Sequence, residues 1–182
     1  ADAIVRGDQA ERFAGLDRSA ASGALRAELG LGPDVALVGL VGYLVEVKQP
    51  AHAVAVLADV RAAGIDAHLV VVGAGPLEAE VREAARSAAV VDHVHLLGHR
   101  DDVEQILGGL DVLVLTSRFE GVPGVLVEAA MTGCPVVTYP VGDVAEVVVH
   151  EETGVIAADA SPRAAAAAVA DLLADPGRRV AL

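Results

Sequence analysis

The sequence predicts an α/β fold in which a parallel β-sheet carries helices on both faces. Short runs rich in β-branched residues alternate with longer helical patterns, which is the order of parallel strands joined by crossover helices. The short runs are nearly continuously apolar, as is typical of strands that are covered on both faces. Of the 182 residues, 54% are hydrophobic but only 2% aromatic, so we expect a core of Val, Leu, Ile and Ala.

The individual elements follow from these patterns. The predicted strands span residues 35–41, 67–72, 94–97, 111–115, 135–138 and 154–157. The predicted helices between them span residues 51–63, 77–89, 101–107, 124–132 and 144–150. A last helix is expected to begin at Ser161-Pro162, because Ser is a favoured N-cap and Pro a favoured first helical residue. Asp101 is the expected N-cap of the helix over residues 101–107.

Residues 1–34 differ from the rest of the chain. The stretch from Arg6 to Asp17 is polar, and a short helix is expected to close at residues 29–33. We interpret residues 1–34 as an interdomain linker and lead-in helix, and residues 35–182 as one domain of ordinary size.

Composition narrows the function. A net charge of −13 argues against a nucleic-acid surface, which needs clustered Lys and Arg. No apolar run approaches the roughly 20 residues needed to cross a bilayer, and the first residues do not resemble a signal peptide. The single Cys134 excludes an internal disulfide and a cysteine-based metal cluster. We therefore expect a cytoplasmic protein.

The histidines do not predict a metal centre. His93 and His95 stand two residues apart, but no third ligand falls near them in the sequence, so we expect neither a metal nor another cofactor. The others are interpreted as surface or boundary residues: His52, His68 and His150.

Ligands of open parallel sheets bind beyond the carboxyl ends of the strands, so the loops there are the candidates for chemistry. After the first strand come Gly42 and Tyr43, then Lys48, the single lysine among 13 basic residues. A glycine permits close backbone approach to a ligand, and a lysine before a helix start can meet a phosphate together with the helix amides. The alternative is a loop with a solvated lysine.

The next two loops carry weaker signals. Gly73-Ala74-Gly75-Pro76 is similar to the opening of a dinucleotide fingerprint, but Glu78 stands near where the third Gly or Ala belongs. NAD is therefore disfavoured, although the turn remains one at which a ligand could pass.

The loop after the fourth strand holds a pair of carboxylates. Glu120-Gly121 precedes Pro123-Gly124, where a helix is expected to begin, and Glu128 falls in its second turn. A free helix N-terminus attracts anions. Carboxylates that flank an anion site are poorly placed for glycosidase acid and base catalysis, which needs them on either side of the scissile bond. The pair suits a ligand with phosphate in the middle and hydroxyl-bearing sugars at both ends.

With these loops in place, the sequence resembles the C-terminal half of a family 4 glycosyltransferase with the GT-B fold. The resemblance covers nearly the whole chain, and its most specific part is the E-x7-E element in its S-R-F-E-G context. Even IVRGDQAERF is similar to the linker that enters this half. The matching pieces are VGLVGYLVEVKQP, LVVVGAGPLEAEV, HLLGHRDDV, DVLVLTSRFEGVPGVLVEAAMTGCPVV, VGDVAEVV and ETGVIAADASP.

The resemblance implies a Rossmann-like domain that binds a nucleotide-sugar donor. Glu120 would hold donor-sugar hydroxyls, Glu128 the ribose and Lys48 the diphosphate, with Lys48 and Glu120 as the catalytic candidates. The implied donor-binding set also includes amides of the helix start, the loop beside the nucleobase and neighbouring loop residues. These are Gly124, Val125 and Leu126, then Gly98, His99 and Arg100, and finally Gly42, Tyr43, Gly73 and Gly121.

The implied reaction is retaining, metal-independent sugar transfer with release of nucleoside diphosphate. The resemblance places the N-terminal acceptor-binding domain, with its catalytic His, and a closing helix after Leu182 outside this chain. We expect the chain alone to bind donor weakly and to transfer nothing. The whole protein would be cytoplasmic, or peripheral to a membrane through its other half.

Two departures from the family pattern keep alternatives open. Tyr43 stands where the family usually has Arg, and Gly142-Asp143 where it commonly has Gly-Gly, which puts an extra carboxylate near the diphosphate. The alternatives are a non-catalytic module derived from this fold, a nucleotide-sugar 2-epimerase and, least favoured, an NAD-binding domain.

Overall fold

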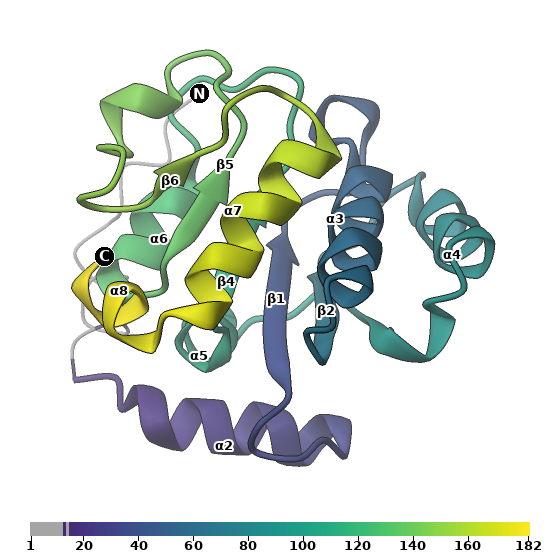
Figure 1. Ribbon diagram of the computed structural model, residues 1–182, viewed down its shortest axis with the longest axis horizontal. Coiled ribbons are helices and arrows are strands. Elements are labelled where there is room, and N and C mark those ends of the chain that lie inside the picture. The colour runs from purple at the N-terminus through teal and green to yellow at the C-terminus, as the bar shows by residue number, and fades with distance from the viewer. Residues whose placement is uncertain (1–12, 14) are drawn as a thin grey trace.

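The computed structural model describes residues 13 and 15–182, and it confirms the predicted fold class. A six-stranded parallel sheet has the strand order β3-β2-β1-β4-β5-β6 (Figure 1). All six predicted strands are present with small changes of boundary. They are β1 (Ala36–Val41), β2 (Ala67–Val72), β3 (Val94–Gly98), β4 (Val112–Leu115), β5 (Val136–Thr138) and β6 (Val155–Ile156).

The helices lie between the strands, as the alternating pattern predicts. Within the described residues the α-helices are α2 (Arg18–Leu29), α3 (Pro50–Ala62), α4 (Glu78–Ser87), α5 (Val103–Gly109), α6 (Gly124–Thr132), α7 (Pro162–Ala174) and α8 (Pro176–Ala181). Short 3-10 turns are η1 (Glu46–Lys48), η2 (Val91–His93) and η3 (Val144–Glu146). Helix α7 begins as predicted, with Pro162 as its first residue and the Ser161 hydroxyl accepting a hydrogen bond from the Ala164 amide.

Two local predictions are wrong. The helix expected over residues 144–150 is only the turn η3, and His150 then pairs with Gly154 in an isolated β-bridge. Three consecutive β-branched valines follow Glu146, and such residues favour extended backbone over helix. Asp101 is not the N-cap of α5, since Asp102 holds that position and its carboxylate binds Arg100 instead of a helix amide.

Two hydrophobic clusters cover the two faces of the sheet. Helices α3, α4 and α7 pack on one face, and α2, α5 and α6 pack on the other. Along β1 the side chains alternate, so that Val38 and Leu40 join the first cluster while Leu37 joins the second. Strand β3 lies at the sheet edge and is only half-buried, so covering on both faces holds for the inner strands.

The predicted lead-in helix is present as α2. It crosses the amino ends of the strands (Figure 1) and packs on α5. Asp17 caps it, and Leu25 is buried in the second cluster. The Arg26 guanidinium lies 2.5 Å from the Asp111 carboxylate, which also accepts the Leu37 amide at 2.8 Å. The domain boundary at residue 34 stays a prediction, and residues 1–12 and 14 lie outside the described part of the chain.

The strand order reverses between β1 and β4. From β1 the chain moves outward through β2 to β3, and from β4 it moves outward in the opposite direction through β5 to β6. The carboxyl ends of β1 and β4 therefore border the crevice where open α/β sheets bind their ligands.

Three histidines meet near the amino ends of β2 and β3. The His68 and His95 rings stack and join at 2.8 Å, and the His93 ring lies 4.8 Å from that of His68. His68 is buried, so its interpretation as a surface or boundary residue is wrong. Burial and the neighbouring His95 and His93 lower the pKa of His68 to about 4, with Arg61 acting in the same direction and Asp66 in the opposite one.

We predict that this cluster makes the fold sensitive to mild acid. Because the pKa of His68 is about 4 in the folded chain and about 6.5 when exposed, the unfolded chain binds more protons between these values. The free energy of unfolding should therefore fall as the pH drops from about 6.5 towards 4. Urea denaturation across this range measures the slope, and His68→Asn should flatten it.

The matched control is His99→Asn, since the His99 side chain is 80% exposed. It should keep the wild-type slope. Equal slopes for the wild type and His68→Asn would contradict the role given to the cluster.

Candidate functional site

The loops that follow β1 and β4 lie side by side and are joined by hydrogen bonds. The Arg118 amide donates to the Val47 carbonyl at 2.8 Å. The Thr116 hydroxyl lies 3.1 and 3.2 Å from the carbonyl oxygens of Lys48 and Gln49. Gln49 has φ of 46°, a left-handed conformation that side chains rarely adopt, so this turn needs support from its surroundings.

This arrangement brings the two catalytic candidates together. Lys48 Nζ lies 2.6 Å from Glu120 Oε1, and the Ser117 hydroxyl donates to the same oxygen. Glu120 is 8% exposed, so its charge is largely removed from water and needs these partners. The Lys48 side chain is 29% exposed, which leaves part of the ammonium open to a ligand.

The candidate glycines have a structural reason in addition to the predicted one. The Gly42 amide donates to Val72 and the Gly73 amide donates to Gly98, which ties the loops after β1, β2 and β3 together. A Cβ on Gly73 would overlap the Gly42 carbonyl. These glycines therefore let loops pack against loops, while ligand contact by Gly42, Gly73 and Gly98 stays a prediction.

Helix α6 presents its N-terminus at the same edge. Pro123 occupies the N-cap and provides no side-chain cap, so the first-turn amides of Gly124 and Val125 carry the positive end of the helix dipole. The Leu126 amide donates to the Pro123 carbonyl and its side chain is buried, so its predicted ligand contact would compete with that bond. Glu128 is half-buried in the second turn.

The loop after β5 closes on Glu120 from another side. The Asp143 amide donates to the Glu120 carbonyl at 3.2 Å. Gly142 has φ of 53°, and a Cβ there would overlap the same carbonyl oxygen. Gly121, by contrast, has open space around it. The exposed Asp143 thus stands beside the candidate site, as the sequence suggests.

The rim of the site is apolar and open. Tyr43 and Phe119 are 62% and 65% exposed, although aromatic residues are scarce in this chain. The hollow at the ends of β1 and β4 has a volume of only about 10 Å³. It is lined by Leu40, Val41, Gly42, Tyr43, Leu44, Lys48 and Leu115. Within this chain the candidate site is therefore a shallow surface.

The residues predicted to lie beside a nucleobase behave differently from one another. The His99 side chain is 80% exposed. Arg100 binds Asp102 at 2.7 Å and Glu28 at 2.6 Å, and both carboxylates raise the pKa of its guanidinium. Arg100 would have to leave these partners to reach a ligand, whereas His99 would not have to leave a buried position.

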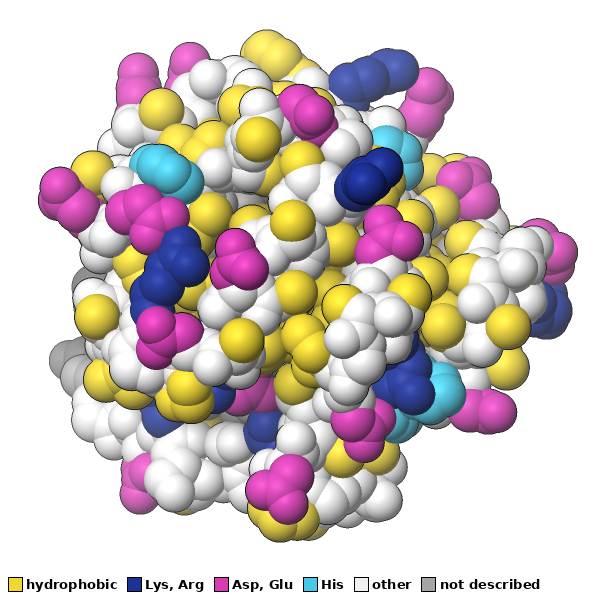
Figure 2. Space-filling view, in the orientation of Figure 1, with side chains coloured by type: hydrophobic (Ala, Val, Ile, Leu, Met, Phe, Trp, Pro, Cys, Tyr) yellow, Lys and Arg dark blue, Asp and Glu magenta, His cyan; other side chains and the backbone are white. Residues whose placement is uncertain are grey.

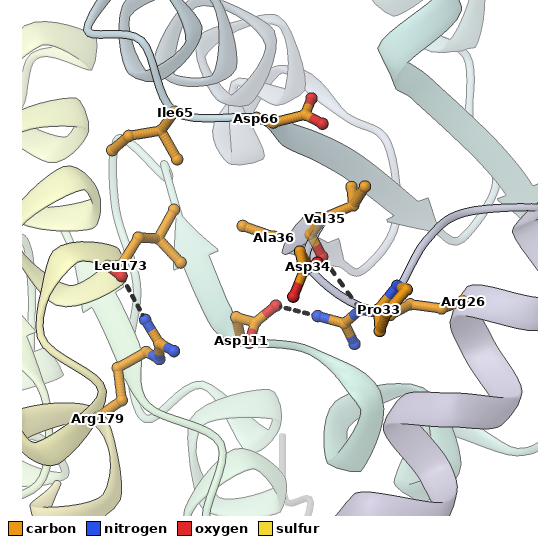
Figure 3. A pocket seen from close by; sticks show the side chains of 10 residues that line it. All are labelled: Arg26, Pro33, Asp34, Val35, Ala36, Ile65, Asp66, Asp111, Leu173 and Arg179. Atoms are coloured by element: carbon orange, nitrogen blue, oxygen red, sulfur yellow. Dashed lines mark hydrogen bonds and ion pairs between the residues drawn. The ribbon is translucent and has the colours of Figure 1, made fainter.

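A larger hollow of about 310 Å³ lies at the opposite end of the sheet, near the starts of β1, β2 and β4 (Figure 3). Its basic groups already have partners, because Arg26 binds Asp111 and Arg179 donates to the Leu173 carbonyl at 2.6 Å. Since ligands of such sheets bind at the carboxyl ends of the strands, we place the functional site beside Lys48 and Glu120.

Other kinds of site find no support in the described part of the chain. Among residues 13 and 15–182, no group of three or more His, Cys, Asp or Glu is arranged to hold a metal ion. None of the helices described is both long enough and apolar enough to span a bilayer. On the face shown in Figure 2, acidic side chains are spread widely instead of gathering at one spot.

The doubly wound parallel sheet, with its loops joined at the switch point, defines a Rossmann-like domain of the GT-B type. The chain belongs to the family described as glycosyl transferases group 1, whose family model matches residues 22–182.

Individual relatives agree with this assignment. The chain is 32% identical over 142 residues to the 2-deoxystreptamine glucosyltransferase of Streptomyces kanamyceticus, covering 77% of this chain and 37% of that protein. It is 33% identical over 172 residues to a GDP-mannose-dependent phosphatidylinositol monomannoside mannosyltransferase of Mycobacterium tuberculosis, covering 90% and 44%. The solved structure of Anabaena HepE in complex with UDP-glucose matches with a TM-score of 0.79 at 22% identity, covering 92% and 48%. The chain thus spans less than half the length of each.

The sequence reasoning missed two residues of this edge. Thr116 and Ser117 bind the Lys48 turn and the Glu120 carboxylate, yet neither was a candidate. Their signal is the position of two adjacent hydroxyls directly after a fully buried strand.

We predict that Gly142→Ala destabilises the chain by about 1–3 kcal/mol, because a side chain at this left-handed position would press on the Glu120 carbonyl. Urea denaturation measures the change. Gly121→Ala is the matched control, since nothing lies near its added Cβ, and it should stay close to wild type. Equal stability of the two variants would show that the loop after β5 does not pack on Glu120 in this way.

Proposed function

We propose that this chain is the donor-binding domain of a retaining nucleotide-sugar-dependent glycosyltransferase, which transfers a sugar and releases nucleoside diphosphate. The observation that carries the proposal is the Lys48–Glu120 pair at the switch point, beside the N-terminus of α6. Membership of the glycosyltransferase family and the names of the relatives support it.

Each group has a role that its chemistry suits. Lys48 and the first amides of α6 would hold the diphosphate and stabilise the charge that develops as it leaves. Glu120 would accept hydrogen bonds from the hydroxyls of the transferred sugar, and Glu128 from the ribose. These positive groups would do in this site what a metal ion does in other phosphate sites, so the proposed transfer needs no metal.

The proposed enzyme is larger than this chain. Because the chain spans less than half the length of its relatives, we propose that the acceptor-binding domain belongs to the remainder of a longer protein. The chain alone would bind donor weakly and transfer nothing. The shallow, open form of the site fits an active site completed by a second domain. We propose a cytoplasmic location for the whole protein.

A non-catalytic module is the second candidate, favoured by two residues of the site. Tyr43 cannot supply the bidentate cationic fork that an Arg would offer to a diphosphate. The exposed Asp143 lies beside Glu120 and adds negative charge where an anion should bind.

Calorimetric titration with UDP, GDP and NAD separates these functions. The proposed function requires one of the two nucleoside diphosphates to bind and NAD not to bind. Binding of NAD alone would contradict it, and binding of none of the three would favour the non-catalytic module.

We predict that the two carboxylates affect different parts of the donor. Glu128→Gln should weaken nucleoside diphosphate and nucleotide-sugar alike, by about 1.5–3 kcal/mol, because a charged acceptor of the ribose is lost. Glu120→Gln should spare the nucleoside diphosphate and remove the extra affinity of the sugar-bearing ligand. Calorimetry with both ligands measures this, and the same loss pattern in both variants would show that the roles are assigned wrongly.

We further predict that Tyr43→Arg tightens nucleoside diphosphate binding by about 1–2 kcal/mol, as expected for a hydrogen bond to a charged group. Tyr43 is 62% exposed, so the longer side chain has room. Asp143→Gly provides the background in which acidic repulsion is removed. If Tyr43→Arg leaves the affinity unchanged even there, the non-catalytic module becomes the better account.

A further inference from the structure

Two adjacent hydroxyls hold the two ends of the Lys48–Glu120 pair. Thr116 and Ser117 follow β4 directly and are 1% and 0% exposed. The Thr116 hydroxyl binds the turn that carries Lys48, and the Ser117 hydroxyl binds the Glu120 carboxylate. One dipeptide at the end of one strand thus fixes a cation from one loop and an anion from another.

The contacts of Glu120 are unequal between its two oxygens. Within the described residues, both side chains that donate to this carboxylate, Lys48 and Ser117, reach Oε1. The only fully buried side-chain nitrogen or oxygen without a partner in that part of the chain is His93 Nδ1. Glu120 Oε2 is therefore either reached by solvent or already partnered, and with both donors on Oε1 it is reached by solvent.

We propose that Ser117 is the positioning residue that assigns separate tasks to the two oxygens of Glu120. Ser117 and Lys48 occupy Oε1, and Oε2 is thereby kept for the hydroxyls of the donor sugar. This inference rests on the proposed function, because it supposes that Glu120 accepts hydrogen bonds from the transferred sugar. Ser117 touches no ligand and acts only through the carboxylate.

The chemistry explains why a second donor is needed. Lysine has three rotatable donors on a flexible stem and fixes a carboxylate as a point charge, without setting its orientation. A buried hydroxyl donates one hydrogen in one direction, so together the two donors fix both the position and the rotation of the carboxylate. Without Ser117, Lys48 can share both oxygens, and Oε2 is no longer reserved for a ligand.

The predicted consequence is selective. Ser117→Ala should leave nucleoside diphosphate affinity within about two-fold, since Lys48 and the α6 amides remain. The advantage of the nucleotide-sugar over its own nucleoside diphosphate should fall about ten-fold, which is the effect of one hydrogen bond to a charged group. A merely structural role would weaken both ligands together.

The experiment uses the 182-residue chain and calorimetry with two donor pairs, UDP-glucose against UDP and GDP-mannose against GDP. The wild type first identifies the pair in which the nucleotide-sugar binds more tightly. Ser117→Ala is then measured on that pair, and Ser117→Cys, nearly the same shape but a weak donor, serves if the alanine variant does not fold. Thr132→Val is the matched control, because it removes a buried hydroxyl that donates to Ala129 inside α6.

Selective loss in the Ser117 variants, with wild-type behaviour of Thr132→Val, supports the inference. An unchanged advantage, or equal loss for both ligands, overturns it and leaves the proposed function standing. A wild type that binds none of the four ligands overturns the proposed function and the inference with it.

Discussion

The Lys48–Glu120 ion pair spans the point where the strand order of the sheet reverses, and the whole carboxyl edge of the sheet is organised around it. A carboxylate as buried as Glu120 is costly unless charge and hydrogen bonds compensate it. Lys48 supplies the charge and Ser117 supplies the hydrogen bond. The surrounding backbone must bring these groups together, and this explains the unusual turn at Gln49 and the close approach at Gly142.

A second buried ion pair, Arg26–Asp111, lies at the amino end of the sheet and shows why burial alone does not make a site. Arg26 also donates to the Val35 carbonyl, and Asp111 also accepts the Leu37 amide, so backbone groups engage both partners. That pair joins α2 to the sheet. Lys48, by contrast, stays partly exposed beside a helix N-terminus, where an anion can reach it.

The sequence predicts most of the fold because its signals are local. Buried parallel strands read as continuous β-branched runs, and Ser161-Pro162 marks a helix start through chemistry that needs no distant partner. The failures occur where distant contacts decide. Asp102 binds Arg100 instead of α5, and His68 is buried because strand pairing places His95 beside it.

The site divides in the same way. Lys48, Glu120 and the start of α6 follow from residue type, spacing and resemblance, and the structure brings them together. Their supports could not be predicted, because the hydrogen bonds of Thr116 and Ser117 and the packing of Gly73 on Gly42 depend on how separate loops meet. The sequence identifies groups that suit a ligand, whereas only the fold shows what holds those groups in place.

The central claim is that the carboxyl edge between β1 and β4 binds a nucleoside diphosphate. An NMR titration of the ¹⁵N-labelled chain with UDP and GDP tests it most directly, since each backbone amide reports its own surroundings. The account predicts that the largest shifts cluster at Gly42, Lys48, Glu120 and Gly124. Shifts confined to the hollow beside Arg26 and Arg179, or no shifts at millimolar nucleotide, would contradict it.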